Sequence, residues 1–176
     1  MIVRTLQWTD FPGVADLFFS RFDEIPTNPD LGLPVPPERP TLGEEAEWFG
    51  REQKEILEGN RVTVVAEEGG KLLGMATVWR LNSHAEHRHG GELAIHVLPG
   101  ARGKGIGEQL MNEVLKLCVG KFEMVRLTVW SINERAQKLY RKHGFVECGR
   151  LPRAIKRGDR YMDQVMMWRP LPQPSA

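Results

Sequence analysis

A short basic stretch rich in glycine has the residue types that bind phosphate. It reads Arg-Gly-Lys-Gly-Ile-Gly at positions 102–107, between an apolar run at 93–98 and a segment at 106–118 whose apolar residues recur at three- and four-residue steps. This pattern predicts a strand, a turn and the start of a helix. Glycines let the backbone turn its N–H groups towards one point, and the first amides of a helix have no intrahelical partner. With the positive charge of Arg102 and Lys104 beside them, these amides are expected to bind phosphate.

Two widespread phosphate motifs fit this turn poorly. In a P-loop the lysine is followed directly by Ser or Thr, whereas Gly105 follows Lys104 and leaves no hydroxyl for magnesium. The dinucleotide fingerprint places its third glycine one residue later than Gly107. A solvated turn that only caps the helix would have a similar composition. Motifs elsewhere in the chain are therefore needed to distinguish a phosphate-binding turn from a turn that only caps the helix.

The composition is that of an ordinary globular protein. The chain has 176 residues, of which 41% are hydrophobic and 27% charged, and this predicts one domain with one core. A net charge of +1 gives no basic field for nucleic acid, and no apolar run approaches the length of a membrane span. The N-terminus lacks a signal-peptide core, and two cysteines make no disulfide framework, so a cytoplasmic location is expected. We expect a single domain over 1–169 and a loose, proline-containing tail over 170–176.

Residue periodicity and capping signals predict the elements that position the turn. Thr41 and Glu44 fit a capping box, as do Ser131 and Glu134, and Gly144 suits a helix C-terminus. The expected helices begin near residue 8 and span 41–57, 106–118 and 131–144. The expected strands span 2–6, 61–67, 71–80, 93–98, 124–130 and 161–168, and a further strand starts over 145–149. The two strands joined by the 106–118 helix should be parallel, with a right-handed crossover, in a mixed and twisted sheet that has helices on both faces.

The segment at 25–40 differs from the rest because it contains six prolines. Proline removes a backbone donor and restricts its neighbours, so a loop with stiff, extended pieces is expected. A loop of this length within a compact domain is typically a lid or a binding loop, although a surface excursion has the same composition. Leu31, Leu33 and Val35 favour a loop that packs on the domain.

Three motifs in order resemble the GNAT acetyltransferases, and more closely their ribosomal-protein and small-amine N-acetyltransferase branches. The glycine-rich turn matches the family pattern Arg/Gln-x-x-Gly-x-Gly/Ala. The segment at 133–145 matches the family spacing of Asn, Ala, Leu-Tyr and Gly-Phe, and the segment at 149–166 is similar to the family's C-terminal strands. The order of elements agrees over nearly the whole chain.

The resemblance implies an α/β (α+β) GNAT fold and an acetyl-CoA-dependent N-acetyltransferase. The fold would be a mixed, mostly antiparallel twisted sheet of six to seven strands, with a splayed central parallel pair and four helices on both faces. The enzyme would transfer an acetyl group from acetyl-CoA to a primary amine, on a small molecule or a protein N-terminus, in one sequential complex. No metal, nucleic acid or membrane partner is expected, and a homodimer would be usual in the family.

The resemblance also places the cofactor. The backbone N–H groups of the glycines and the Arg102 side chain would hold the pyrophosphate. The strand that ends near Val97 would pair with the pantetheine arm, in a V formed with the strand that ends near Trp130, and would offer an N–H to the thioester carbonyl. The cofactor-binding residues implied in this way are Val97, Leu98, Arg102, Gly103, Lys104, Gly105, Ile106, Gly107, Asn133 and Tyr140.

The same resemblance assigns two catalytic residues. Tyr140 matches the family tyrosine that protonates the leaving thiolate, although its helical spacing also suits a core residue. Glu92 is the candidate base that deprotonates the amine, directly or through water, with an exposed strand-end glutamate as the alternative. His96 is the second candidate base, and a satisfied, partly buried histidine is the alternative there. Asn133 would bind the pantetheine arm or simply cap a helix.

The sequence gives only weak signals for a metal site or a cysteine nucleophile. The spacing of His84, His87 and His89 suits neither a helical nor a strand metal site, and Cys118 falls on an apolar helix face that belongs in the core. Two alternatives to the enzyme stay open at this level: a non-catalytic CoA-sensing module, and a nucleotide-binding protein that uses the same turn for ATP. The acceptor, the acyl length and the oligomeric state are not encoded in any motif.

Overall fold

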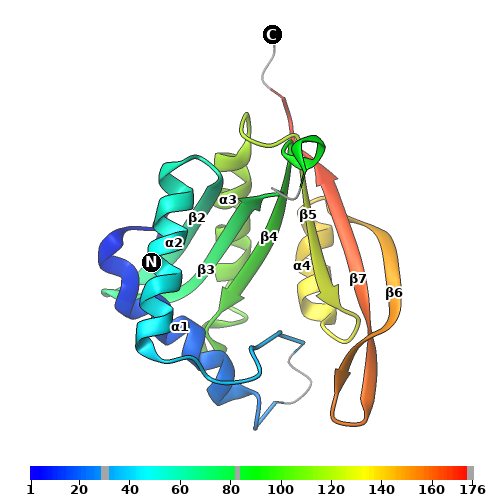
Figure 1. Ribbon diagram of the computed structural model, residues 1–176, viewed down its shortest axis with the longest axis horizontal. Helices are drawn as coiled ribbons and strands as arrows, with labels where there is room; N and C mark the ends of the chain where they lie inside the picture. The colour runs from blue at the N-terminus through cyan, green and yellow to red at the C-terminus, as the bar shows by residue number, and fades with distance from the viewer. Residues whose placement is uncertain (29–31, 82–83, 174–176) are drawn as a thin grey trace.

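A computed structural model describes residues 1–28, 32–81 and 84–173. Within these residues the chain forms one seven-stranded sheet and four α-helices (Figure 1). The strands are β1 (Ile2–Thr5), β2 (Arg61–Glu68), β3 (Lys71–Arg80), β4 (Gly90–Val97), β5 (Met124–Trp130), β6 (Val146–Arg157) and β7 (Arg160–Pro170). The α-helices are α1 (Phe11–Glu24), α2 (Leu42–Leu57), α3 (Ile106–Cys118) and α4 (Glu134–Lys142), with short 3₁₀ turns at Trp8–Asp10, Ala85–His87 and Pro99–Ala101.

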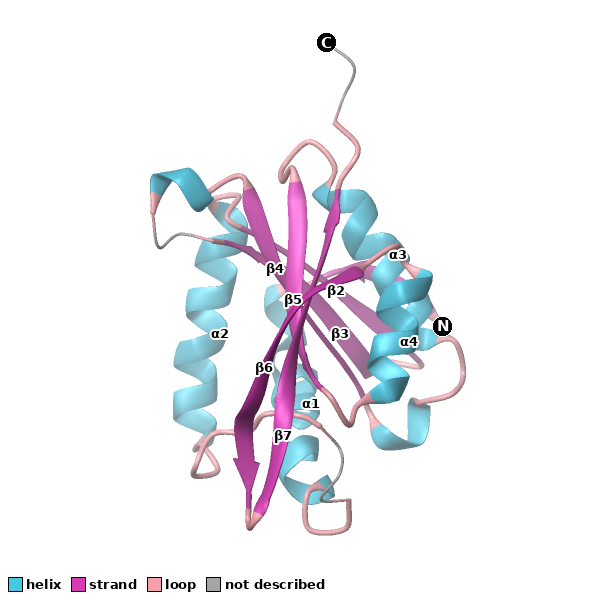
Figure 2. Ribbon diagram, turned by 90° about the vertical axis from the view of Figure 1, so that its right-hand side faces the viewer, coloured by secondary structure: helices cyan, strands magenta, loops and turns pink. Residues whose placement is uncertain are grey.

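The strand order is β1-β2-β3-β4-β5-β7-β6, and of the neighbouring pairs in the described chain β4–β5 alone is parallel. Helices α1 and α2 cover one face of the sheet, and α3 and α4 cover the other (Figure 2). This arrangement confirms the expected mixed sheet with helices on both faces. No helix in the part of the chain that the structure describes is long and apolar enough to cross a membrane.

The core has two parts, one under each helical layer. The larger part packs the apolar stripe of α3 against the sheet, and Leu110, Met111 and Val114 are fully buried there. Cys118 lies in the same stripe, and burial raises the pKa of its thiol to about 12, so the thiol is protonated at neutral pH. This agrees with the expectation that Cys118 is a core residue. The smaller part lies under α1 and α2 around Leu17 and Phe49.

The parallel strands β4 and β5 separate along their length. They pair only from Gly90↔Met124 to Glu92↔Arg126, whereas β4 continues to Val97 and β5 to Trp130. The two strands therefore form a V whose arms diverge towards their C-terminal ends. This is the splayed central pair that the sequence resemblance predicted.

Several boundaries differ from the sequence-based expectation. Strand β4 begins at Gly90 rather than near 93, and the strand that starts at Val146 continues to Arg157. Helix α4 begins at Glu134 with Asn133 as its N-cap, whose side chain accepts the Ala136 N–H at 3.1 Å, so the predicted capping box at Ser131 is wrong. The hydroxyl of Ser131 instead accepts the backbone N–H of Asp163 on β7 at 3.2 Å. Strand β7 runs on to Pro170, and the next residue, Leu171, is buried. Apolar burial thus extends the sheet into the segment expected to be loose.

Candidate functional site

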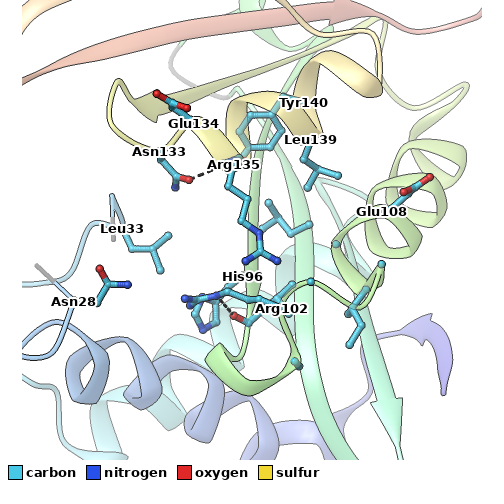
Figure 3. A pocket seen from close by; sticks show the side chains of 18 of the residues that line it. Asn28, Leu33, His96, Arg102, Glu108, Asn133, Glu134, Arg135, Leu139 and Tyr140 are labelled. Atoms are coloured by element: carbon cyan, nitrogen blue, oxygen red, sulfur yellow. Dashed lines mark hydrogen bonds between the residues drawn. The ribbon is translucent and has the colours of Figure 1, made fainter. Parts of the chain in front are cut away.

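A cavity of about 590 Å³ lies where β4, the glycine-rich turn and α4 meet (Figure 3). Its lining includes Ile95, His96 and Val97, in the part of β4 that no longer pairs with β5. The structure thus brings together most of the predicted site residues. Those that line the cavity include Ile95, His96, Val97, Arg102, Gly103, Gly105, Ile106, Gly107, Asn133, Arg135, Leu139 and Tyr140.

The glycine-rich turn presents unpaired backbone donors at the cavity wall. Gly103 has φ 84° and Gly105 has φ 77°, a left-handed conformation that favours glycine, and Gly105 is the N-cap of α3. The backbone N–H groups of Gly103, Lys104 and Gly105 donate to no other group in the described residues. Several unpaired N–H groups at a helix N-terminus attract an anion, so this turn can hold one chemically.

The side chain of Arg102 is bound elsewhere. Its Nε donates to the Val97 carbonyl at 2.9 Å, and its two terminal nitrogens donate to both carboxylate oxygens of Glu24 at the end of α1, with Nη2–Oε2 at 2.7 Å. Both side chains are largely buried, 19% exposed for Arg102 and 9% for Glu24. The charge of Arg102 is therefore balanced inside the protein, and its guanidinium ties the turn to α1.

Two other predicted cofactor residues lie outside this cavity. Leu98 donates its backbone N–H to Leu73 on β3 at 2.9 Å and packs against the core. Lys104 is exposed. Both line a second hollow beside the N-terminal residue Met1. The main cavity thus uses the glycines of the turn and not its lysine.

Tyr140 lines the cavity from the last turn of α4 and is 7% exposed. Its ring packs against Phe145, with the ring centroids 6.0 Å apart. Burial raises the pKa of its phenol to about 12, so the hydroxyl keeps its proton at neutral pH. A protonated phenol at a cavity wall can donate a proton to an anion that forms there.

Asn133 holds both the helix and the proline-rich loop. As the N-cap of α4 its side-chain oxygen is already occupied by Ala136. Gly32 packs directly on it, since a Cβ at Gly32 (φ 64°) would lie 2.8 Å from the Asn133 Cβ. The described part of the loop is thus packed on the domain, as the apolar residues at 31–35 favoured, although Leu31 lies outside the described residues.

His96 is a neutral histidine that faces α1. The hydroxyl of Ser20 donates to the Leu17 carbonyl at 2.7 Å and lies 3.2 Å from His96 Nε2, so this hydroxyl accepts from an Nε2–H. Burial, together with the charges of Arg21 and Arg102, lowers the pKa of His96 to about 3. Its Nδ1 is buried and has no hydrogen-bond partner in the described chain.

Glu92 lies at the vertex of the V, because its pairing with Arg126 is the last between β4 and β5. Its carboxylate forms an ion pair with Arg126 at 3.1 Å and is 23% exposed. Side chains alternate along a strand, so Glu92 and His96 share the face of β4 that looks towards α1 and α2. Glu92 does not line the cavity itself.

A contact between distant segments joins one lining residue of the cavity to the last hairpin. Arg157, at the end of β6, donates to the Leu33 carbonyl in the proline-rich loop at 2.9 Å, and Leu33 lines the cavity. The Arg157 guanidinium also lies over the ring of Trp130, 4.4 Å from its centroid, at the end of β5. The loop and the last hairpin thus meet beside the opening of the V.

Sequence reasoning placed the proline-rich loop and the last hairpin, with Arg157, at the acceptor site, but it missed Glu24 and Arg135 as parts of the site and the contact between Leu33 and Arg157. A signal for Arg135 was available, because it lies four residues before Leu139 and therefore shares a helix face with a residue next to Tyr140. No local signal marks Glu24 or the Leu33–Arg157 contact, since their partners lie 78 and 124 residues away.

Comparison with known proteins agrees with the family resemblance found in the sequence. The sequence model of the acetyltransferase (GNAT) family matches residues 22–145. Phosphinothricin N-acetyltransferase from Alcaligenes faecalis is 27% identical over 171 residues, which cover 96% of this chain and 82% of that protein.

Solved structures agree with the fold. A ribosomal-protein-alanine N-acetyltransferase from Brucella melitensis superposes with a TM-score of 0.82 at 23% identity, over 97% of this chain and 100% of that chain. A GNAT superfamily phosphinothricin acetyltransferase from Sinorhizobium meliloti, solved in complex with AcCoA, has a TM-score of 0.80 at 23% identity, over 97% of this chain and 88% of that chain. At these identities the likeness establishes the fold alone.

Proposed function

The chain belongs to the acetyltransferase (GNAT) family, and from this premise we propose that it transfers the acetyl group of acetyl-CoA to the primary amine of a small molecule. The observation that carries the proposal is the cavity between the splayed strands, which has open backbone donors of Gly103 and Gly105 at one end and the buried phenol of Tyr140 on its wall. The pyrophosphate would lie on the glycine-rich turn. The pantetheine arm would lie along the unpaired side of β4, where its amides can form strand-like hydrogen bonds.

The chemistry follows from a direct attack. The neutral amine forms a bond to the thioester carbon, and the carbonyl electrons move to oxygen. A backbone N–H of β4 near Val97 stabilises this oxyanion, a kind of contact that contributes about 3–4 kcal/mol in other enzymes. When the C–S bond breaks, the thiolate of CoA takes the proton of Tyr140, which burial keeps on the phenol.

Glu92 is proposed as the group that accepts the proton of the incoming ammonium, through water. Its position at the vertex of the V, on the face of β4 that is turned towards α1 and α2, supports this role. His96 is less suited, because its Nε2 is bound to Ser20 and its Nδ1 is shielded from solvent. A protonated Glu92 would return its proton to solvent. The second proton, which the nitrogen loses as the tetrahedral intermediate collapses, would return to the Tyr140 phenolate and complete the cycle.

The acceptor is proposed to be small because Arg157 joins Leu33, which lines the cavity, to the end of β5 at Trp130, beside the opening of the V. A protein N-terminus must bring a trailing chain, and this bridge narrows the path for one. The relative from Alcaligenes faecalis is named for phosphinothricin, a small molecule, which supports the same choice over a protein N-terminus. A cytoplasmic location and a homodimer stay predictions.

Isothermal titration with acetyl-CoA tests the proposal. Gly105→Glu should abolish binding, because a carboxylate would occupy and repel the pyrophosphate site at a left-handed position. The matched control is Gly100→Glu, which adds the same charge at an exposed glycine with open space around it and should bind normally. Absence of binding by the unmodified protein would refute the proposal. Binding without CoA release in a screen of primary amines, peptides included, would favour a CoA-sensing module instead.

A further inference from the structure

The pyrophosphate site that the glycine-rich turn offers lacks the arginine that the sequence suggested for it. Arg102 is the first residue of the turn, but its guanidinium is engaged by both carboxylate oxygens of Glu24 and by the Val97 carbonyl. A pyrophosphate carries two negative charges, and backbone N–H groups supply only partial positive charge. A second cation near the turn would therefore be needed for strong, oriented binding.

Arg135 is placed to supply that cation from the opposite wall. It lies in the first turn of α4 and its side chain extends from the helix into the cavity, towards β4 and the glycine-rich turn (Figure 3). A Cβ built on Gly103 would lie 3.8 Å from Arg135 Nη2, so the guanidinium faces the open amides of the turn at short range. The side chain of Arg135 makes no ion pair or hydrogen bond with any other residue that the structure describes.

The surrounding charges favour an anion at this position. The cavity-lining Glu108 is bound to Lys142 at 2.7 Å, and Glu134 lies 3.9 Å from Lys138 on the same helix. The acidic side chains near Arg135 thus have cations of their own. A planar guanidinium can bind two oxygens of one phosphate at once, which fixes the orientation of the group as well as its charge.

We propose that Arg135 closes the phosphate site from the α4 side and binds the pyrophosphate of CoA against the backbone N–H groups of Gly103 and Gly105. This inference rests on the proposed function, since it assumes that CoA is the ligand. It assigns the phosphate-binding charge to Arg135, and it leaves Arg102 as the residue that holds the turn in place.

Arg135 is on the same helix as the proposed proton donor. Arg135 and Tyr140 belong to the same helix and are five residues, or about 7.5 Å, apart along its axis. A pyrophosphate bound to Arg135 therefore fixes the helix that carries the proposed proton donor. The phosphate contact, remote from the reacting carbon, would help to align the phenol with the thiolate.

The test compares Arg135→Gln with Lys116→Gln, which removes an exposed cation of α3 that pairs with Glu113 and does not line the cavity. The probes are CoA, dephospho-CoA, which keeps the pyrophosphate, and pantetheine, which has no phosphate, each titrated by calorimetry. Arg135→Gln should weaken CoA and dephospho-CoA alike, by about tenfold or more, because a charge-assisted hydrogen bond is lost. Pantetheine binding and the melting temperature should stay unchanged, and Arg135→Lys should restore part of the affinity.

The outcomes separate this inference from the proposed function. If the unmodified protein binds no CoA, the proposed function fails, and this inference fails with it. If it binds CoA and Arg135→Gln binds equally well, only the role of Arg135 is refuted. A loss confined to CoA, with dephospho-CoA unaffected, would overturn the pyrophosphate assignment in favour of the 3′-phosphate. Equal losses in Arg135→Gln and Lys116→Gln would show a general charge effect and would also overturn the proposal.

Discussion

Arg102 and Glu24 form a two-point ion pair that joins the glycine-rich turn to the end of α1, across 78 residues of sequence. Because both side chains are largely buried, removal of one partner leaves the other as a buried, uncompensated charge. We therefore expect Glu24→Gln or Arg102→Gln to destabilise the protein by about 2 kcal/mol. For a domain of this size the melting temperature should fall by about 4–8 °C in a calorimetric scan.

The neighbouring pair Arg39–Asp23 provides the control for this prediction. Its side chains are 52% and 65% exposed, so Arg39→Gln should change the melting temperature little. The double variant Glu24→Gln with Arg102→Gln should be more stable than the sum of the single effects predicts, because no charge is left unpaired. Additive losses would contradict a direct interaction between the two residues.

The fold was predictable because its signals are local. Each strand and helix that surrounds the site has its own periodicity, and the Thr41–Glu44 capping box appears in the structure as expected. The error at α4 has a local cause as well. Ser131 and Asn133 are both good N-cap residues, and the choice depends on Asp163, a residue on a distant strand that engages the Ser131 hydroxyl.

The partners of the site residues were less predictable than the elements. The glycine-rich turn and Tyr140 could be found from the sequence. That Arg102 binds Glu24 could not, nor could the contact between Leu33 and Arg157. Such contacts are set by tertiary packing between segments far apart in the chain. One sequence shows that charged residues exist and does not show how they are paired.

Tyr140→Phe should separate binding from chemistry. The phenol is proposed to protonate the CoA thiolate, and general acid catalysis of this kind typically contributes about 10²–10⁴-fold to the rate. The variant should therefore lose about that much in kcat, whereas its affinity for acetyl-CoA should stay the same because the ring is retained. A thiol-release assay and calorimetry measure the two quantities. An unchanged kcat would assign Tyr140 to the core alone.

Glu92→Gln should lower the rate of acetyl transfer at neutral pH by a factor of about 10²–10⁴ and leave acetyl-CoA binding intact, since the amide cannot accept the proton of the ammonium. The rate should recover in part at high pH, where the amine loses its proton to solvent. The control is Glu113→Gln on α3, which removes a carboxylate that pairs with Lys116 at 3.4 Å. A Glu92→Gln enzyme with the original rate and pH profile would contradict the proposed base.

The burial of His96 makes the protein sensitive to acid. The pKa of this histidine is about 3 in the folded chain and about 6.5 in the unfolded chain. As the pH falls below 6.5, His96 therefore takes up a proton in the unfolded state but not in the folded state, and acid favours unfolding. The contribution of neutral His96 to stability is present above pH 6.5 and is lost on acidification. Between pH 7 and pH 5 this residue should lower the free energy of unfolding by about 2 kcal/mol.

Urea denaturation at a series of pH values measures this effect. His96→Asn should lose less stability between pH 7 and pH 5 than the unmodified protein does, because its side chain does not titrate. His84→Gln removes an exposed histidine and should retain the full acid dependence. If His96→Asn and His84→Gln lose stability equally with acid, the buried histidine is not the source.

The contact between Arg157 and the Leu33 carbonyl should control which amines reach the thioester. Arg157→Ala removes the 2.9 Å hydrogen bond and the cation over Trp130, so the proline-rich loop and the last hairpin lose the link that joins them beside the opening of the V. The KM for a small amine substrate should rise by about fivefold to tenfold, as expected for one lost charge-assisted hydrogen bond that orders the site. Acetyl-CoA affinity should not change, because the phosphate site lies on the glycine-rich turn.

The stronger test is the change in preference between acceptors of different size. With the bridge removed, kcat/KM for a longer amine or a short peptide should rise relative to the small amine, since a trailing chain then has an exit. Lys156→Ala is the control on the same hairpin, because it alters a cation that lies 5.4 Å from the centroid of the Tyr161 ring and leaves the Leu33 contact intact. If Arg157→Ala and Lys156→Ala keep the same preference, the bridge does not restrict the acceptor, and a protein N-terminus returns as the better candidate.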